Sequence, residues 1–263
     1  MANENFKTIQ SVERALSIIQ CIDGRTDGMS LNELSETLSL NVGTVRGLAM
    51  TLLSNGYLMK NENTNRFFLG YEFLIKSQQV SEGYVRFLRT CAYSYMEQIA
   101  NHHQVNVWLQ ISLHNRIYTI DVVESENAFY TYSPKPGINV PLHASVSGKL
   151  YVASLTKEER DILISNLDLK KLAPNTITER KLFAEEIDKA LKQGYAVVNE
   201  ETDIGMSGVG APIYGSGNRL AGTLSVVAPT SLLNMKLDGL IPELKAACEK
   251  TSALLLSLDK KIL

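Results

Sequence analysis

The sequence predicts an α+β protein with an N-terminal winged helix-turn-helix, a helical linker and a larger domain built on an antiparallel sheet. Residues 29–70 have the pattern of two short helices followed by a two-stranded wing. Residues 105–258 show strands, then helices, then strands again, which is typical of helices packed on an antiparallel sheet. The 263 residues suffice for two domains of ordinary size. We place the winged helix in residues 1–70, the linker in 71–83 and the larger domain in 84–263.

The first helix of the helix-turn-helix is predicted to begin directly after Ser30. Ser30 and Glu33 form a Ser-x-x-Glu capping box, in which each side chain satisfies a backbone donor left free at the helix start. Leu31, Leu34 and Leu38 follow at three- and four-residue spacing, so they share one helical face. This face is expected to be buried.

The second helix is predicted between Asn41 and Gly56. Asn41 stands where an N-cap is needed, and Gly56 suits the left-handed turn that ends a helix. One apolar stripe, which faces the first helix, consists of Val45, Leu48, Ala49 and Leu52. The opposite, outward face carries Gly43, Thr44, Arg46, Gly47, Met50 and Thr51. These are the side chains that a DNA groove would meet, although two short amphipathic helices also occur in many proteins that bind no DNA.

The segments that flank this motif complete a winged-helix pattern. Residues 57–60 and 66–69 are predicted to pair as a hairpin around the polar loop 61–65, which would be the wing. A support helix is expected from Ser11 to about Asp23. Its predicted buried face consists of Val12, Ala15, Leu16 and Ile19. Residues 71–80 are predicted to continue as a helical connector, and the composition changes at residues 81–83.

The larger domain is predicted to begin with a helix over residues 84–102. In residues 105–112 apolar and polar residues alternate, as in a strand with one solvent-exposed face, and residues 117–123 complete a hairpin. A third strand is expected at residues 129–133. The remaining predicted elements are helices at about 144–154, 157–166, 178–192 and 238–258, and strands at about 207–214 and 219–228.

Composition and charge limit the function classes. The chain is 44% hydrophobic and 21% charged, and it has neither a membrane-length apolar run nor the apolar segment of a signal peptide, so we expect a cytoplasmic protein. Its three cysteines are far apart, which favours buried thiols over a disulfide framework. Residues 1–75 hold six Lys or Arg against eight Asp or Glu. This half therefore lacks the basic footprint of most nucleic-acid binders and would depend on dimerisation and backbone amides for phosphate contacts.

Several motifs were weighed for catalysis or cofactor binding. A phosphate-binding loop around Lys149 would need Gly in place of His143 and Ser or Thr in place of Leu150. The glycines between residues 205 and 210 precede a strand, which excludes a dinucleotide fingerprint. No Gly-x-Ser-x-Gly nucleophile motif is present. The sequence therefore predicts neither an enzyme nor a cofactor.

Two further segments were considered as binding sites. His102 and His103 are adjacent, so on a helix they diverge by about 100°, and no metal site is predicted there. Residues 145–148 form the start of a predicted helix, where free backbone N–H groups suit an anionic ligand such as a carboxylate. A ligand pocket is the preferred interpretation of this segment.

The chain as a whole resembles the IclR family of bacterial transcriptional regulators. The N-terminal strings that carry the resemblance are Ser11-Val12-Glu13-Arg14-Ala15-Leu16, Leu31-x-x-Leu34-Ser35, Thr44-Val45-x-x-Leu48, Leu53-x-x-x-Tyr57-Leu58 and Arg66-x-x-Leu69-Gly70. In the second half they are Pro141-Leu142-His143-Ala144-Ser145-x-x-Gly148-Lys149 and Gly205-x-x-x-Val209-x-Ala211-Pro212-Ile213. Their joint order and spacing make the match specific. It implies a GAF/PAS-like effector-binding domain behind the winged helix.

The resemblance also implies two sets of site residues. The residues expected to bind DNA are Asn41, Gly43, Thr44, Arg46, Gly47, Met50, Asn65 and Arg66. The residues expected to bind the effector are Ser145, Val146, Ser147, Met206, Gly208, Ser225 and Val227. Family members that sense small polar acids commonly have Cys where this chain has Gly208 and Ser where it has Val227, so a roomier and more apolar pocket is expected here.

These observations predict a ligand-responsive regulator of a metabolic operon. Its expected partners are double-stranded operator DNA, a small-molecule effector with carboxylic acids as the candidate class, and further copies of the chain in a homodimer or tetramer; no membrane partner is expected. An aromatic wall from Trp108, Tyr118, Tyr130 and Tyr132 is one possibility for the pocket, and ordinary core roles are the other. The alternative function is a cytoplasmic metabolite-binding protein whose helix-turn-helix no longer reads DNA.

Overall fold

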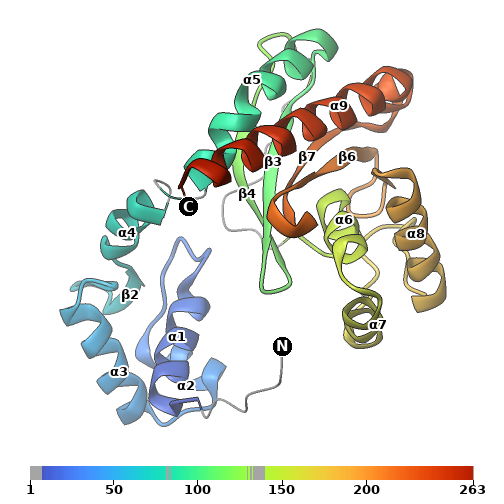
Figure 1. The fold of residues 1–263 in the computed structure, drawn as a ribbon. Coiled ribbons are helices and arrows are strands. Elements are labelled where there is room, and N and C mark those ends of the chain that lie inside the picture. The colour runs from blue at the N-terminus through green and yellow to red at the C-terminus, as the bar shows by residue number, and fades with distance from the viewer. Residues whose placement is uncertain are drawn as a thin grey trace. The chain divides into compact units, whose positions relative to one another are not determined.

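A computed structural model describes residues 8–80, 83, 85–128, 130, 132 and 140–262. The chain forms two compact units, residues 1–83 and residues 84–263 (Figure 1). None of the helices in the described ranges has the length and apolar character required to cross a membrane.

The first unit is a winged helix. Its helices are α1 (Gln10–Ile22), α2 (Leu31–Leu38), α3 (Val42–Ser54) and α4 (Glu72–Val80), and its strands are β1 (Leu58–Asn61) and β2 (Arg66–Leu69). β1 and β2 pair antiparallel as the predicted wing. The capping box of Ser30 and Glu33 is present, and the Asn41 side chain accepts a hydrogen bond from the Gly43 N–H at 2.7 Å. Local sequence signals thus set the start of both helices of the motif.

The buried face of α1 differs from the prediction. Ile18 and Ile22 are buried against α2 and α3, whereas Val12 and Leu16 are 53% and 52% exposed. The helix carries two apolar stripes, and its period alone does not determine which of them meets the rest of the unit. The exposed stripe begins at Ile9, which is 67% exposed.

The second unit contains a five-stranded antiparallel sheet. Its helices are α5 (Arg86–His103), α6 (Val146–Ser154), α7 (Lys157–Asn166), α8 (Arg180–Gln193) and α9 (Thr230–Ile262). Its strands are β3 (Val107–Leu113), β4 (Arg116–Val123), β5 (Ala196–Asn199), β6 (Met206–Tyr214) and β7 (Leu220–Pro229), with the short 3₁₀ turn η2 (Ser216–Asn218) between the last two. The strand order is β4-β3-β7-β6-β5, so β3 pairs with β7 from the far end of the chain.

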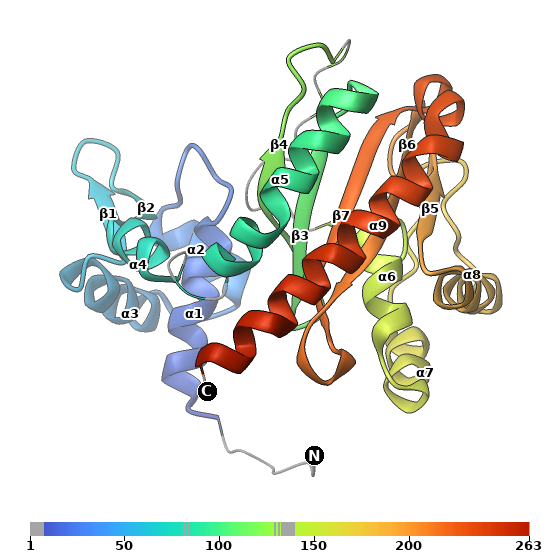
Figure 2. The same ribbon diagram turned by 45° about the horizontal axis from the view of Figure 1, so that its top comes forward.

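Helices cover both faces of this sheet. α5 and α9 lie on one face, and α6, with α7 and α8 beside it, lies on the other (Figure 2). The prediction of a solvent-exposed face on β3 is therefore wrong, because Trp108 and Gln110 are 6% and 3% exposed. The short strand β5 was not predicted, and α9 begins eight residues earlier than expected. Tyr130 and Tyr132 are not in a strand, and the rest of the strand predicted at residues 129–133 lies outside the described residues.

The two adjacent histidines at the end of α5 also differ from expectation. Their ring centroids are 4.5 Å apart, and both rings contact Glu243 of α9. α5 ends at His103, and the next residue, Gln104, has a positive φ of 54°. Side-chain rotation about this last turn overcomes the divergence of about 100° between the two Cα–Cβ bonds.

Glycines in β6 allow α6 to lie directly on the sheet. A Cβ atom added to Gly210 would come within 2.4 Å of the Leu224 carbonyl oxygen and 2.8 Å of Val146 Cγ1. A Cβ atom on Gly208 would come within 3.0 Å of Val146 Cγ2. The side chain of Val146, the first residue of α6, therefore occupies the space that larger residues would fill.

We predict that Gly210→Ala lowers the free energy of unfolding of the second unit by about 1–3 kcal/mol, the usual cost of overpacking. The clash is with backbone, so rotation of a side chain cannot relieve it. Gly215→Ala is the matched control, because its Cβ would make only an ordinary contact of 3.6 Å with Ala221. Chemical denaturation of both variants checks this, and equal stability of Gly210→Ala and wild type would contradict the close packing of β7 and Val146 around Gly210.

Candidate DNA interface and effector site

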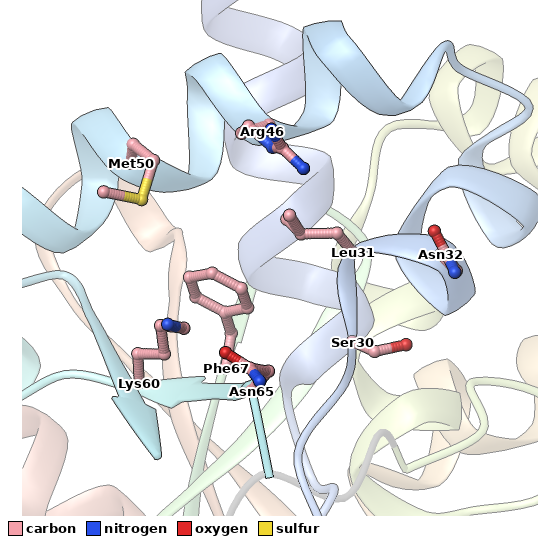
Figure 3. A pocket seen from close by; sticks show the side chains of 8 residues that line it. All are labelled: Ser30, Leu31, Asn32, Arg46, Met50, Lys60, Asn65 and Phe67. Atoms are coloured by element: carbon pink, nitrogen blue, oxygen red, sulfur yellow. The ribbon is translucent and has the colours of Figure 1, made fainter. Parts of the chain in front are cut away.

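A groove of about 390 Å³ lies on the first unit between α3, the start of α2 and the wing. Figure 3 shows Arg46 and Met50 reaching into it from α3, with Lys60, Asn65 and Phe67 opposite them. Ser30, Leu31 and Asn32 complete it from α2. Two cations and three neutral polar side chains thus meet at one concave surface.

The predicted recognition face of α3 is exposed to solvent. The exposed residues are Asn41, Gly43, Thr44, Arg46, Gly47, Met50 and Thr51. Lys60 forms an ion pair with Glu62 at 2.9 Å, whereas no ion pair of Arg46 occurs in the described part of the chain. Asn65, which lies in the wing and has a positive φ of 54°, faces the same groove.

Asn32 and Lys60 were not predicted as groove residues, and Ser30 was predicted only as a helix cap. The helix-turn-helix motif itself could have indicated these residues, because the first helix of such a motif crosses the DNA backbone. The start of α2 presents backbone N–H groups that suit a phosphate.

Gly47 occupies the middle of the exposed face of α3. A Cβ atom on Gly47 would have no neighbour within 4 Å, so nothing inside the unit requires glycine there. Glycine in a helix interior costs roughly 1 kcal/mol relative to alanine. A residue that is unfavourable for the isolated helix suits a surface that another molecule approaches closely.

Arg66 differs from the other predicted DNA-binding residues because its guanidinium group is engaged within the unit. It donates to the carbonyl oxygens of Asp27 at 2.8 Å and Gly28 at 3.0 Å, and to Glu33 Oε1 at 3.1 Å. The pKa of Glu33 is lowered to about 2, chiefly by the hydrogen bond from the Ser30 N–H and with a smaller contribution from Arg66. Arg66 thus fixes the wing to the start of α2, and we leave it out of the proposed DNA contacts.

The predicted effector residues come together on the sheet face that α6 covers. Gly208 lies opposite Val227, and Gly210 lies opposite Ser225, in the register of β6 and β7. Val146 packs against both glycines. Met206 is the first residue of β6, opposite Pro229. The expectation of a more apolar surface agrees with this arrangement, but the expected extra room beside Gly208 is filled by Val146 and Val198.

The hydroxyl groups predicted to bind the effector are hydrogen-bonded within the protein. Ser147 donates to Gln110 Oε1 and lies 2.6 Å from Thr223 Oγ1, and Ser225 donates to the same Gln110 oxygen at 3.2 Å. Ser145 Oγ accepts from the Gly148 N–H at 3.1 Å and donates to the Pro141 carbonyl. In this conformation Ser147 holds α6 to the sheet, Ser225 bonds within the sheet, and Ser145 caps α6. The N–H groups of the first turn of α6 remain beyond the helical hydrogen-bond pattern.

Two aromatic residues border this site. Trp108, opposite Ser225 on β3, stacks on Tyr132 with ring centroids 5.7 Å apart and an interplanar angle of 8°. The Tyr132 hydroxyl donates to Asp203 at 3.1 Å, and burial followed by the Asp203 charge raises its pKa to about 12. The buried indole N–H of Trp108 has no hydrogen-bond partner among the described residues.

The other two tyrosines of the expected aromatic wall have separate positions. The Tyr130 hydroxyl donates to the Val227 carbonyl oxygen at 3.0 Å, next to the site. Tyr118 lies on β4 and is 41% exposed. Only part of the expected wall therefore forms.

A buried ion pair lies one turn into α6. Lys149 is 1% exposed and binds Glu201, which is 6% exposed; the carboxylate of Glu186 on α8 lies 4.0 Å from Lys149 Nζ. Burial raises the pKa of Glu201, and the Lys149 ammonium opposes that rise. The burial of the Lys149 side chain was not predicted from the sequence.

Comparison with known proteins relates both units to one family. The bacterial transcriptional regulator IclR C-terminal domain matches residues 85–253, which is most of the second unit, and the IclR helix-turn-helix domain matches residues 11–62. The chain belongs to the IclR family. It is a DNA-binding transcriptional regulator with an effector-binding C-terminal domain.

Individual IclR-family proteins are similar along nearly the whole chain. XynR of Escherichia coli strain K12, an HTH-type transcriptional regulator, is 26% identical over 223 residues, which are 85% of this chain and 87% of XynR. The crystal structure of an IclR regulator from Alicyclobacillus acidocaldarius has a TM-score of 0.79 at 21% identity, covering 94% of this chain and 99% of that one. An IclR homologue from Microbacterium hydrocarbonoxydans, crystallised with 4-hydroxybenzoate, has a TM-score of 0.75 at 19% identity and covers 93% and 98%.

We predict that Lys149→Met lowers the free energy of unfolding by about 3–5 kcal/mol, because it leaves a buried carboxylate unpaired. Without Lys149 the folded-state pKa of Glu201 rises further above its ordinary value of 4.5. The folded variant then holds a proton that the unfolded chain releases, so its stability falls as the pH rises through that window. The variant should be weakest relative to wild type at about pH 8 and closer to it at about pH 5.

The double variant Lys149→Met/Glu201→Leu is the control, since it removes both charges. Denaturant unfolding at both pH values checks the prediction. A pH-independent loss of stability in Lys149→Met, or no recovery in the double variant, would show that the pair does not act as described.

Proposed function

We propose that this regulator binds operator DNA through the groove between α2, α3 and the wing, and that a small effector acts at the contact between α6 and strands β6 and β7. The observation that carries the DNA part is the groove itself, where Arg46 and the wing face one concave surface. A protein that acts on chromosomal DNA works in the cytoplasm, where we place it.

Base recognition is assigned chiefly to Arg46. Its side chain is exposed, lines the groove and makes no ion pair within the described ranges. Arginine pairs with the O6 and N7 atoms of guanine, and Thr44 suits a phosphate or a thymine methyl group. Backbone N–H groups at the start of α2 and the side chain of Lys60 suit phosphates.

The protein is proposed to act as a homodimer or as a tetramer made of two such dimers. One recognition helix with a single arginine offers few contacts, so two half-sites are needed for specific binding. The apolar stripe of Ile9, Val12 and Leu16 on α1 is more than half exposed, which supports self-association.

We predict a pseudo-palindromic operator whose half-sites are one helical turn apart or a multiple of it. Footprinting tests this, and protection of a short asymmetric site by a monomer would contradict it.

The effector is proposed to be an aromatic or apolar carboxylic acid. Val146, Val198 and Val227 make the site apolar, and Trp108 stacked on Tyr132 offers an aromatic border. The indole N–H, which has no partner in the described part of the chain, and the first N–H groups of α6 are donors suited to a carboxylate or hydroxyl. The complex of the Microbacterium hydrocarbonoxydans homologue with 4-hydroxybenzoate supports this class as the first to test.

Effector binding and movement of α6 are proposed to be one event. Val146 fills the space beside Gly208, and Ser147 is bonded to Gln110, so a ligand must displace the start of α6 to enter. A ligand that favours the displaced state shifts the population toward it. The free energy of this population shift then changes the affinity for DNA.

No catalytic role is proposed. A serine nucleophile at Ser145 or Ser147 would need His143 as its base, but within the described residues His143 is bonded to the Lys170 carbonyl oxygen at 2.9 Å. Ser145 donates to the Pro141 carbonyl and Ser147 to Gln110, so no such pair forms there. The alternative function, a metabolite-binding protein that no longer reads DNA, is favoured by one observation: the net negative charge of residues 1–75. DNA binding distinguishes the two.

We predict that Arg46→Ala weakens operator binding by about 1–3 kcal/mol and relaxes the preference at one base pair of each half-site. Fluorescence anisotropy with the upstream region of the protein's own gene measures this. Lys76→Ala on α4 is the control, because it removes a cation that pairs with Glu72 outside the groove.

The outcomes separate the possibilities. Equal weakening on all sequences would make Arg46 a phosphate contact. Unchanged binding in Arg46→Ala would contradict the proposed interface, and no sequence-specific binding by wild type would establish the alternative function.

A further inference from the structure

The end of α5 and the middle of α9 bring together three side chains that commonly ligate metals. His102 Nδ1 lies 2.8 Å from Glu243 Oε1, and His103 Nε2 lies 3.2 Å from Glu243 Oε2. The three candidate ligand atoms lie within 4.8 Å of one another. This cluster is separate from both sites described above.

The distances suit a small divalent ion. Zinc binds imidazole nitrogen and carboxylate oxygen at about 2.0–2.2 Å in tetrahedral geometry, which separates neighbouring ligand atoms by roughly 3.4 Å. The nitrogen–oxygen distances of 2.8 Å and 3.2 Å are about 0.6 Å and 0.2 Å shorter than this separation, so the ligands must move outward, His102 most, to accept an ion. Two histidines and one carboxylate leave a fourth position for water.

The buried histidine supplies an independent observation. His103 is 8% exposed, and its Nε2 atom is buried without a hydrogen-bond partner among the described residues although it faces the Glu243 carboxylate. Buried polar atoms are normally paired, and each exception needs an explanation. A cation between Nε2 and the carboxylate satisfies both groups.

Helix α9, opposite the histidines, has a glycine where the buried His103 ring lies against it. A Cβ atom on Gly239, one turn before Glu243, would come within 3.1 Å of His103 Cε1. The glycine therefore lets the imidazole lie against α9 with Nε2 directed toward the carboxylate. Imidazole and carboxylate ligands together favour zinc and neighbouring first-row ions over calcium or magnesium.

We propose that His102, His103 and Glu243 bind a divalent transition-metal ion of the zinc class, which links the end of α5 to α9. Both helices pack on the same face of the sheet, so the ion stabilises the second unit by tying two elements that are far apart in sequence. Binding to the folded state alone also raises the unfolding temperature.

The test uses the full chain, stripped with a chelator and titrated with Co²⁺ and Zn²⁺. We expect one ion per chain, a tetrahedral Co²⁺ absorption band and an unfolding temperature that rises with Zn²⁺. Mutation of residues that only orient metal ligands weakens metal binding by roughly 10–100-fold. Loss of a ligand itself in His103→Gln or Glu243→Gln should therefore weaken binding by at least about 100-fold. His114→Gln, in the turn between β3 and β4, removes a histidine elsewhere and should bind as wild type does.

A variant of the exposed ligand His102 tests the proposal even if a variant of a buried ligand fails to fold. The His102 side chain is 67% exposed, so His102→Gln should fold normally, as checked by circular dichroism, and still lose Co²⁺ binding. Metal affinity in folded His102→Gln equal to that of wild type would overturn the proposal. A thiolate–cobalt charge-transfer band, or no Co²⁺ absorption band in wild type, would overturn it as well.

Discussion

The start of α6 lies directly on the backbone of β6, and the arrangement of the effector domain depends on this contact. Gly208 and Gly210 leave no side chain between helix and strand, so Val146 fills the space above them. With α6 at this depth, Ser147 reaches Gln110 in the sheet and Lys149 reaches the buried carboxylate of Glu201. One close packing contact thus positions an apolar surface, a polar network and an ion pair.

The DNA-binding domain uses a different means to fix its parts. Arg66 holds the wing to the residues before α2 through hydrogen bonds to Asp27, Gly28 and Glu33. Glu33 also caps α2 through the Ser30 N–H at 2.7 Å. These connected polar contacts hold the wing to the start of α2 on one side of the groove, which suits a surface that must keep its shape when DNA binds. Arg66 holds the wing in place, and Arg46 is left to contact a binding partner.

Features encoded within a few residues were predictable from the sequence. The capping box of Ser30 with Glu33 and the left-handed glycine that follows α3 are local signals, and the structure confirms them. Features set by distant partners were not. Four features depend on segments far away in the chain, which periodicity does not identify. They are the buried stripe of α1, the burial of Trp108, the hydrogen bonds of Arg66 within the unit and the filled space beside Gly208. The resemblance to the family suggested the effector positions, but only the structure showed that Ser147 and Ser225 both donate to Gln110 and that Ser145 caps α6.

The central claim is that an effector enters between α6 and strands β6 and β7 and thereby changes DNA affinity. Trp108 borders this site and is the only tryptophan of the chain, so its fluorescence reports on the site alone. The direct measurement is a titration of the full-length protein with 4-hydroxybenzoate and related aromatic acids, followed by Trp108 emission and, in parallel, by operator binding. We expect at least one acid to change both signals over the same concentration range. An acid that shifts operator affinity while Trp108 emission stays constant would contradict it.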